Sequence, residues 1–166
     1  MDNQLNLNAV WLTHTHYDHI QGLDACLKFN DSVSIYVHSI ESSRVGAEGS
    51  VIHVNDGDNI QLGGSCWDII HTPGHSPGGI CFYSAPHLIT GDTLFVNGCG
   101  RADITGANVD DLYRSLERLK TYPVDTIIYP GHDYARRQND LLGNQFESNR
   151  FLKASDYEAF VTLRMK

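Results

Sequence analysis

Long apolar runs are absent from this sequence of 166 residues, of which 41% are hydrophobic and 19% are charged. Such a composition is typical of a globular protein, and no membrane-spanning helix is predicted without an apolar run of about 20 residues. The first ten residues, MDNQLNLNAV, contain no basic segment followed by an apolar stretch. No secretory signal is therefore expected, and the cytoplasm is the default location.

Basic residues are also scarce: the sequence contains 12 Lys and Arg but 20 Asp and Glu, which gives a formal net charge of −8. Proteins that bind nucleic acids usually carry a basic face. Together with the missing apolar run, this balance predicts neither a nucleic acid nor a membrane as a partner.

Cysteine is sparse and scattered, at Cys26, Cys66, Cys81 and Cys99, and no CxxC pair occurs. Neither a disulfide scaffold nor a thiolate zinc site is therefore indicated, and we expect reduced thiols that are mostly packed. A GxSxG element is missing as well. Catalysis by a serine or cysteine nucleophile is thus not indicated.

Short apolar segments alternate with polar loops and with two amphipathic stretches. The expected strands are residues 9–12, 34–38, 59–62, 66–71, 80–83, 88–90 and 126–129, and the expected helices are residues 20–30 and 110–122. The tail, residues 137–166, is predicted to be helical, with Tyr157, Phe160 and Val161 as anchors. The pattern indicates an α/β fold in a single domain, residues 1–166, because this length suits one core and crowds two.

Histidine is the residue type that stands out, and several of the nine histidines lie in short loops that follow predicted strands. Residues 14–19 read HTHYDH, and His75, Asp92 and His132 follow three later strands. Because strand ends lie along a common edge of a sheet, we expect these four loops to converge. Imidazole and carboxylate donors suit zinc, iron or manganese.

Four motifs in this order resemble the metallo-β-lactamase superfamily: HTHYDH at 14–19, HTPGH at 71–75, TGDTLF at 90–95 and YPGHDY at 129–134. The resemblance implies an αββα sandwich that binds two divalent metal ions, with zinc favoured and iron or manganese as alternatives. It places His14, His16 and His75 around one ion, Asp18, His19 and His132 around the other, and Asp92 between them. His71 is expected to be a supporting residue.

Such a centre is expected to work through a metal-activated hydroxide, because a bound metal lowers the pKa of water towards about 7. The hydroxide would attack a carbonyl that the second ion polarises. Asp18 or Asp92 would then orient the nucleophile or accept its proton.

The segment GCGRAD at 98–103 narrows the resemblance to the branch that contains glyoxalase II and the persulfide dioxygenases. Glyoxalase II implies glutathione contacts at the positions of Arg101 and Tyr134, whereas Asp103 replaces a tyrosine of that family. Persulfide dioxygenases imply a single iron on His14, His75 and Asp92. Residues 140–145 and 149–152 resemble the tails of compact hydrolases that accompany polyketide synthase clusters.

We therefore expect a hydrolase of small-molecule or carrier-bound acyl thioesters, with an iron-dependent glutathione persulfide dioxygenase as the alternative. A third possibility is a truncated, weakly active metal-binding protein, because only 13 residues precede His14 where the family has several strands. The missing strands would expose a sheet edge, which invites self-association and lowers stability.

Overall fold

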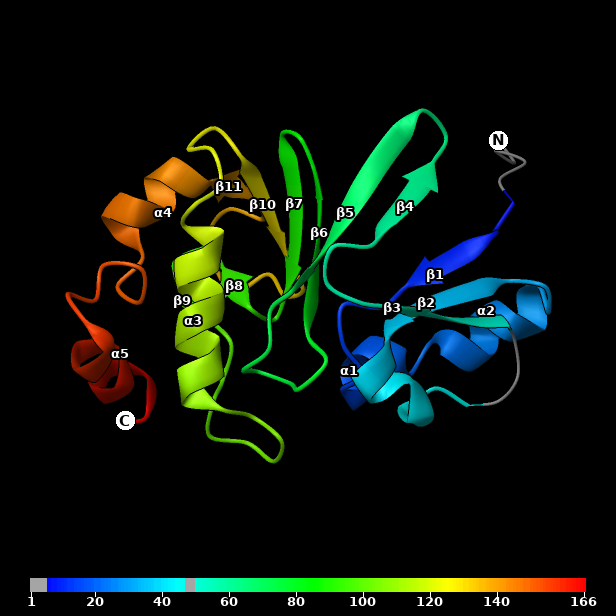
Figure 1. Cartoon of the computed structure of the whole chain (residues 1–166), viewed down its shortest axis with the longest axis horizontal. Coiled ribbons are helices and arrows are strands. Elements are labelled where there is room, and N and C mark those ends of the chain that lie inside the picture. Colours follow the sequence, from blue (N-terminus) through cyan, green and yellow to red (C-terminus); the bar gives the residue numbers. More distant parts are fainter. Residues whose placement is uncertain (1–5, 47–49) are drawn as a thin grey trace.

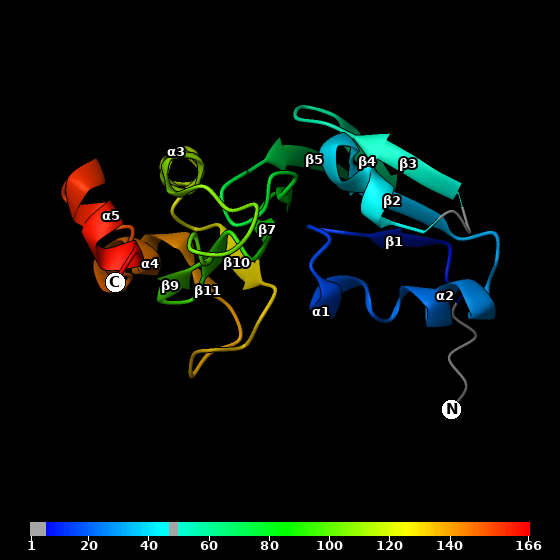
Figure 2. The same ribbon diagram turned by 90° about the horizontal axis from the view of Figure 1, so that it is seen from below.

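The computed structural model describes residues 6–46 and 50–166 and arranges them as two sheets between two layers of helices (Figures 1 and 2). The strands are β1 (Ala9–Trp11), β2 (Ser34–His38), β3 (Ser50–Val54), β4 (Asn59–Leu62), β5 (Ser65–His71), β6 (Ile80–Ser84), β7 (His87–Gly91), β8 (Leu94–Phe95), β9 (Gly98–Cys99), β10 (Ile127–Pro130) and β11 (Asp140–Leu141). The α-helices are α1 (Tyr17–Ile20), α2 (Leu23–Phe29), α3 (Val109–Leu119), α4 (Leu142–Ser148) and α5 (Tyr157–Arg164), and η1 (Ser39–Arg44) is a 3-10 helix.

The two large sheets differ in their pairing. The first has the order β1-β2-β3 and is parallel throughout. The second has the order β11-β10-β7-β6-β5-β4, and its only parallel pair is β10 with β7. A small ribbon of β8 and β9 follows β7. The ends of β1, β5, β7 and β10 carry the four histidine and aspartate loops.

Alternating side chains divide the interior into three cores. On β6, Phe82 faces the core between the two sheets, whereas Cys81 faces the core under α3 and α5. On β2, Ile35 faces the core under α2, whereas Tyr36 faces the other sheet. This period of two is what a strand buried on both faces requires. Three cores separate four layers, so the predicted αββα sandwich of the α/β class is confirmed.

The predicted strands and helices are found within one to three residues of their expected ends, with two corrections in the first half of the chain. The expected helix over residues 20–30 is divided into α1 and α2, separated by Gln21 and Gly22. The strand β3 was missed, because a polar stretch precedes it and its own residues include Ser50 and His53. Its pairing with β2 over five residues makes it a strand.

The tail is only partly helical, which corrects the prediction for residues 137–166. The chain first adds β11 to the edge of the larger sheet, then forms α4, and reaches α5 only after a series of turns. Phe160 is fully buried and Val161 packs against the same core, as predicted. Tyr157 is 39% exposed, so its prediction as a buried anchor was wrong.

All four cysteines are free, as expected, but only two of them are packed. Cys66 is exposed and Cys26 is half-buried, so the expectation that most would be packed was wrong. Burial raises the pKa of Cys81 to about 11 and that of Cys99 to about 12. These two thiols therefore stay protonated at neutral pH and are poor nucleophiles.

Two features of the structure bear on the predicted absence of a membrane-spanning helix and on the predicted self-association along a sheet edge. Within residues 6–46 and 50–166, no helix combines the length and the apolar character that a membrane crossing requires. In the described part of the chain, β1 is an outer strand of its sheet, and self-association along it stays a prediction.

The core between the sheets gives a stability test through Phe82, which is 1% exposed and whose ring centroid lies 5.3 Å from that of Trp11. We expect Phe82→Ala to lower the free energy of unfolding by about 3–5 kcal/mol, because it removes buried contacts and leaves a cavity. The matched control is Phe29→Ala, at a residue 74% exposed, which should change it by less than about 0.5 kcal/mol. Denaturant titration of both variants checks this, and equal effects would contradict the assigned layers.

Candidate metal centre

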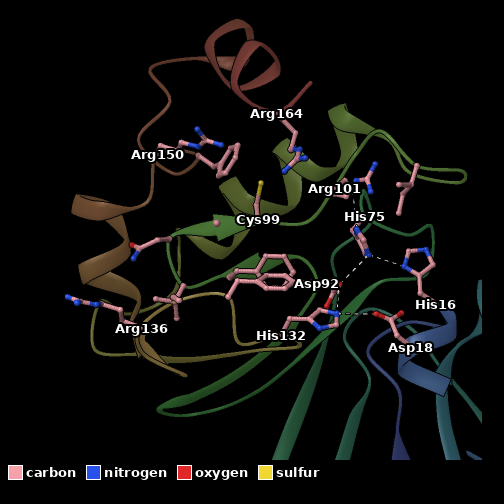
Figure 3. A pocket seen from close by; sticks show the side chains of 18 residues that line it. His16, Asp18, His75, Asp92, Cys99, Arg101, His132, Arg136, Arg150 and Arg164 are labelled. Carbon is pink, nitrogen blue, oxygen red and sulfur yellow. Dashed lines mark hydrogen bonds and ion pairs between the residues drawn. The ribbon is translucent and has the colours of Figure 1, made fainter. Parts of the chain in front are cut away.

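The four loops converge and bring seven donor side chains together, which we name the donor cluster. Figure 3 labels His16, Asp18, His75, Asp92 and His132 of this cluster. The donor atoms form three groups, and within each group the atoms lie within 4.8 Å of one another. These groups are His14, His16 and His75; His14, His19 and Asp92; and Asp18, His19 and His132. The convergence expected from the strand ends is therefore present in the structure.

The first loop supplies four of the seven donors, and its backbone passes from an extended to a helical conformation along these residues. His16 is extended, with φ −65° and ψ 153°, and it caps the short helix α1. His14 precedes it in the extended stretch, whereas Asp18 and His19 lie within α1. The change from extended chain to helix explains why one hexapeptide can serve two neighbouring positions.

Asp92 lies between the two outer groups of donors. Its Oδ1 is 3.4 Å from His19 Nε2, and its Oδ2 is 3.5 Å from His75 Nε2 and 3.4 Å from His132 Nε2. On the open side, Asp18 Oδ2 lies 3.3 Å from His132 Nε2, and the Asp18 side chain is 54% exposed. Asp92 thus contacts donors of both groups, whereas Asp18 faces the solvent-accessible pocket.

Two glycines allow the loops to come this close. Gly74 has φ +133°, and an added Cβ would collide with the backbone of Leu112 on α3. An added Cβ on Gly131 would meet the carboxylate of Asp92 and the ring of His19. Glycine is therefore required beside both His75 and His132.

Burial keeps the innermost histidine neutral. Burial, together with the positive charge of His19, lowers the pKa of His14 to about 3. Burial also lowers the pKa of His75, whose Nδ1 lies 3.0 Å from the carbonyl oxygen of Arg101. With Nδ1–H donating to that carbonyl, Nε2 of His75 presents a lone pair to the cluster. Neutral imidazole is the form that binds a metal ion.

Two buried atoms of the cluster lack a hydrogen-bond partner within the described residues, namely His14 Nε2 and Asp92 Oδ1. Burial alone would raise the pKa of Asp92, but His19 and the other imidazoles outweigh it and hold this pKa below its ordinary value. A buried carboxylate oxygen and a buried imidazole lone pair both accept a cation. Unsatisfied acceptors at the centre of seven donors therefore fit a metal ion.

Glu41 was missed by the sequence reasoning, although it connects two of the loops. It lies in η1, is 2% exposed and accepts hydrogen bonds from the backbone N–H of Thr15 at 2.7 Å and its hydroxyl at 2.8 Å. Its other oxygen accepts from the N–H of Gly78 at 2.9 Å. Thr15 stands between His14 and His16, and Gly78 follows His75. Glu41 therefore fixes two donor loops, and only its burial, which needs the structure, distinguishes it from a surface glutamate.

The remaining predicted residues lie around the cluster. His71 is not among the seven donors, and its Nε2–H donates to the carbonyl of Pro77 at 2.9 Å. Its ring stacks on that of His38 at a centroid distance of 4.1 Å. Tyr134 is 73% exposed and stacks on His132 at 5.1 Å. His71 therefore supports the second loop, as expected, while Tyr134 borders the opening.

A pocket of about 900 Å³ leads away from the cluster. Arg101 lines it and pairs through two nitrogens with Asp103, at 2.9 Å each. Five donors reach this pocket, namely His16, Asp18, His75, Asp92 and His132. A substrate in the pocket would thus meet the donors directly.

Comparison with known proteins gives consistent similarities. The model of a family described as the metallo-beta-lactamase superfamily matches residues 2–132. The chain is 32% identical over 162 residues to the probable polyketide biosynthesis zinc-dependent hydrolase BaeB of Bacillus velezensis, covering 96% of the chain and 72% of that protein. It is 36% identical over 126 residues to the hydroxyacylglutathione hydrolase of Salmonella typhi, covering 76% of the chain and 48% of that protein.

Among solved structures, the chain is similar to ETHE1 from Myxococcus xanthus, with a TM-score of 0.86 and 30% identity. This match covers 98% of the chain and 70% of ETHE1. The chain thus spans about half of the Salmonella hydrolase but more than two thirds of BaeB and of ETHE1.

Glu41→Gln tests the link between the loops. The amide nitrogen would face a backbone or hydroxyl donor, so we expect metal-free protein to lose about 2 kcal/mol of unfolding free energy. Metal affinity should fall by about 10- to 100-fold, as for other residues that orient ligands. Denaturant titration and competition with a chelating dye measure the two effects. Glu117→Gln, at a partly exposed residue that pairs with Lys120, is the control and should change neither.

The same variant has an expected pH dependence. Burial raises the pKa of Glu41, but its hydrogen bonds, that from Gly78 first, outweigh burial and hold it below the ordinary 4.5. Its stabilising contribution is therefore complete above about pH 4.5 and is lost as the pH falls through the lower folded-state pKa. The difference in unfolding free energy between wild type and Glu41→Gln should narrow with acidification below that pH. If the difference in unfolding free energy between the two proteins did not change with pH, the assignment of Glu41 as an ionised acceptor would be contradicted.

Proposed function

This chain belongs to the metallo-beta-lactamase superfamily, and we propose that it is a metal-dependent hydrolase of acyl thioesters. Its relatives include the probable zinc-dependent hydrolase BaeB and a hydroxyacylglutathione hydrolase. The observation that carries the proposal is the continuous pocket, which has the donor cluster at one end and room for a long substrate beyond it.

The donor cluster suits two divalent metal ions, with zinc as the first choice. His14, His16 and His75 would hold one ion, Asp18, His19 and His132 the other, and Asp92 would contact both. Cys99 lines the same pocket but belongs to none of the three groups of donors. Bound divalent ions lower the pKa of water towards about 7 and polarise a carbonyl group.

The chain's own residues supply orientation and proton transfer. The carbonyl of Arg101 accepts from His75 Nδ1 and fixes the imidazole ring that faces Asp92. Asp92 is 8% exposed and is held by three histidines, so it positions donors better than it exchanges protons with solvent. Asp18 is half exposed and lines the pocket, where its Oδ1 and Oδ2 can accept a proton from an attacking water and release it to solvent.

The walls of the pocket suit the acyl group and the arm of a thioester. Phe95, Val96 and Ile104 line it beside the donors, and these apolar side chains exclude water from a bound acyl chain. Tyr134 stacks on His132 at the opening, where it can orient the substrate. The leaving group of a thioester departs as a thiolate and needs no proton from a general acid. The exposed carboxylate of Asp18 therefore has to accept only the proton of the attacking water.

The second candidate function is the iron-dependent oxidation of a glutathione persulfide. The high TM-score to ETHE1, together with the GCGRAD segment, supports it. A single iron per chain, with oxygen consumed when the persulfide is added, would favour this candidate over thioester hydrolysis. Full metal occupancy without either activity would favour the third possibility, a weakly active metal-binding protein.

A thioester panel tests the leading proposal. Protein loaded with zinc, iron or manganese should release free thiol from acylated glutathione, coenzyme A or carrier-protein substrates, measured with a thiol reagent. Activity should disappear after chelation of the metal and return when the metal is added again, because histidine and aspartate, the residues of the cluster, are ligands of divalent metal ions. No turnover on any of these thioesters with any of the three metals would refute the proposal.

Asp92→Asn tests the residue that contacts both groups of donors. Removing its charge should lower the bound metal from two ions to one or fewer and reduce kcat/KM by at least about 100-fold, since even residues that only orient ligands cost 10- to 100-fold. Elemental analysis and steady-state kinetics measure these changes. Asp133→Asn is the matched control, because Asp133 is exposed, follows His132 and lies outside the pocket lining. Loss of activity in both variants would argue against a specific role of Asp92.

A further inference from the structure

Arginine side chains gather along the pocket beside and beyond the donor cluster. Four arginines line the pocket, whereas its two carboxylates, Asp18 and Asp92, both belong to the cluster. Figure 3 shows Arg136 and Arg150 well away from the donor cluster and Arg164 nearer to Arg101, and we name Arg136, Arg150 and Arg164 the arginine wall. The chain as a whole carries a formal charge of −8, so this gathering of positive charge is local.

Two of these arginines carry charges that no neighbour neutralises. Arg164 lies 3.9 Å from Asp103, which also pairs with Arg101 at 2.9 Å. Arg136 and Arg150 are exposed and form no ion pair with any carboxylate of the described residues. Unpaired guanidinium groups that line a pocket are suited to bind an anion, because their planar forks match phosphate and carboxylate oxygens.

The side chain of Arg150 is held in place by packing. Its guanidinium carbon lies 4.7 Å from the centroid of the Phe151 ring, and the guanidinium carbon of Arg164 lies 5.6 Å from the same centroid. Phe151 itself is 6% exposed and belongs to the core under α3 and α5. A fixed aromatic ring thus orients two guanidinium groups, which reduces the entropy that they would lose on binding.

We propose that the arginine wall binds the phosphate of a phosphopantetheine arm, so that the substrates are acyl thioesters of coenzyme A or of a carrier protein. This inference rests on the proposed thioester hydrolysis and adds the chemical class of the thiol. The thioester carbonyl lies at the donor cluster, the neutral pantetheine arm runs along the middle of the pocket, and the phosphate reaches the wall.

The charges along the pocket favour this arm over glutathione. The pocket is also lined by apolar residues such as Val96, Ile104 and Phe151, which suit the neutral amides and methyl groups of pantetheine. Glutathione carries an ammonium group at its γ-glutamyl end, and no carboxylate outside the donor cluster lines the pocket to receive it. Arg101, the arginine beside His75 in Figure 3, is already paired with Asp103. The unpaired positive charges lie further away, where the phosphate of the longer arm would be.

The experiment compares acetyl-phosphopantetheine with acetyl-pantetheine, which differ by one phosphate. We expect KM to be roughly tenfold lower for the phosphorylated substrate, as two partly exposed charge pairs would produce. In the double variant Arg136→Gln, Arg150→Gln this preference should disappear. Arg114→Gln, at an exposed arginine of α3 outside the pocket, is the matched control and should keep it. Circular dichroism and thermal unfolding check that the double variant is folded.

A binding measurement separates this inference from the proposed function. Calorimetry on metal-free protein with the free thiols should show phosphopantetheine binding more tightly than pantetheine, and added salt should weaken the difference. If no thioester is hydrolysed but this difference holds, the hydrolase proposal fails and the arginine wall stands. Equal affinity for both thiols, or a preference that survives in the double variant, would overturn the inference.

The source of the arm is read from two further substrates. Acetyl-coenzyme A and an acetylated carrier protein share the phosphopantetheine group, and preference for either supports the inference while identifying the donor. Acetylated glutathione serves as the competing substrate. A higher kcat/KM for it than for both phosphorylated carriers would overturn the assignment of the wall.

Discussion

The buried carboxylate of Glu41 joins two loops that belong to different sheets. Its oxygens accept from Thr15 in the loop after β1 and from Gly78 in the loop after β5. A carboxylate that is 2% exposed is stable only when its acceptors are satisfied, so these hydrogen bonds cannot be exchanged for water without loss. Glu41, which is itself no donor, therefore helps to fix the relative position of the two sheets at the donor cluster, together with the backbone hydrogen bond from Ile80 N–H to the carbonyl of Thr13.

Charge is separated along the pocket in a way that suits its proposed chemistry. At the inner end, burial and mutual repulsion keep His14 neutral, and the imidazoles keep Asp92 ionised. At the outer end, arginines without carboxylate partners face the solvent. A divalent ion would relieve the unsatisfied acceptors at one end, and an anion would neutralise the other. One substrate that places its polarised carbonyl and its negative charge far apart satisfies both ends.

Much of the fold and of the site could be predicted from the sequence, because both depend on local patterns. Period-two alternation predicted β2, and short apolar segments between polar turns predicted β5 and β6. The ends of the predicted strands pointed to the convergence of His14, His75 and His132. What could not be predicted depends on partners distant in sequence. The strand β3 exists because β2 pairs with it, and β11 because β10 does. Glu41 acquires its role only through burial beneath two loops, and the unpaired state of Arg150 requires knowing which carboxylates lie nearby.

The spread of the donors along the chain has a consequence for how the protein is made. His14 lies in the first loop and His132 follows β10, so the cluster is complete only when nearly the whole domain has left the ribosome. The sheet that carries β1 to β3 can form earlier, from a continuous stretch of the nascent chain. During that interval HTHYDH is an incomplete chelator without the shielding of β7 and β10. A complete set of donors is therefore available to a metal ion only after β10 has joined the larger sheet and brought His132 to the cluster.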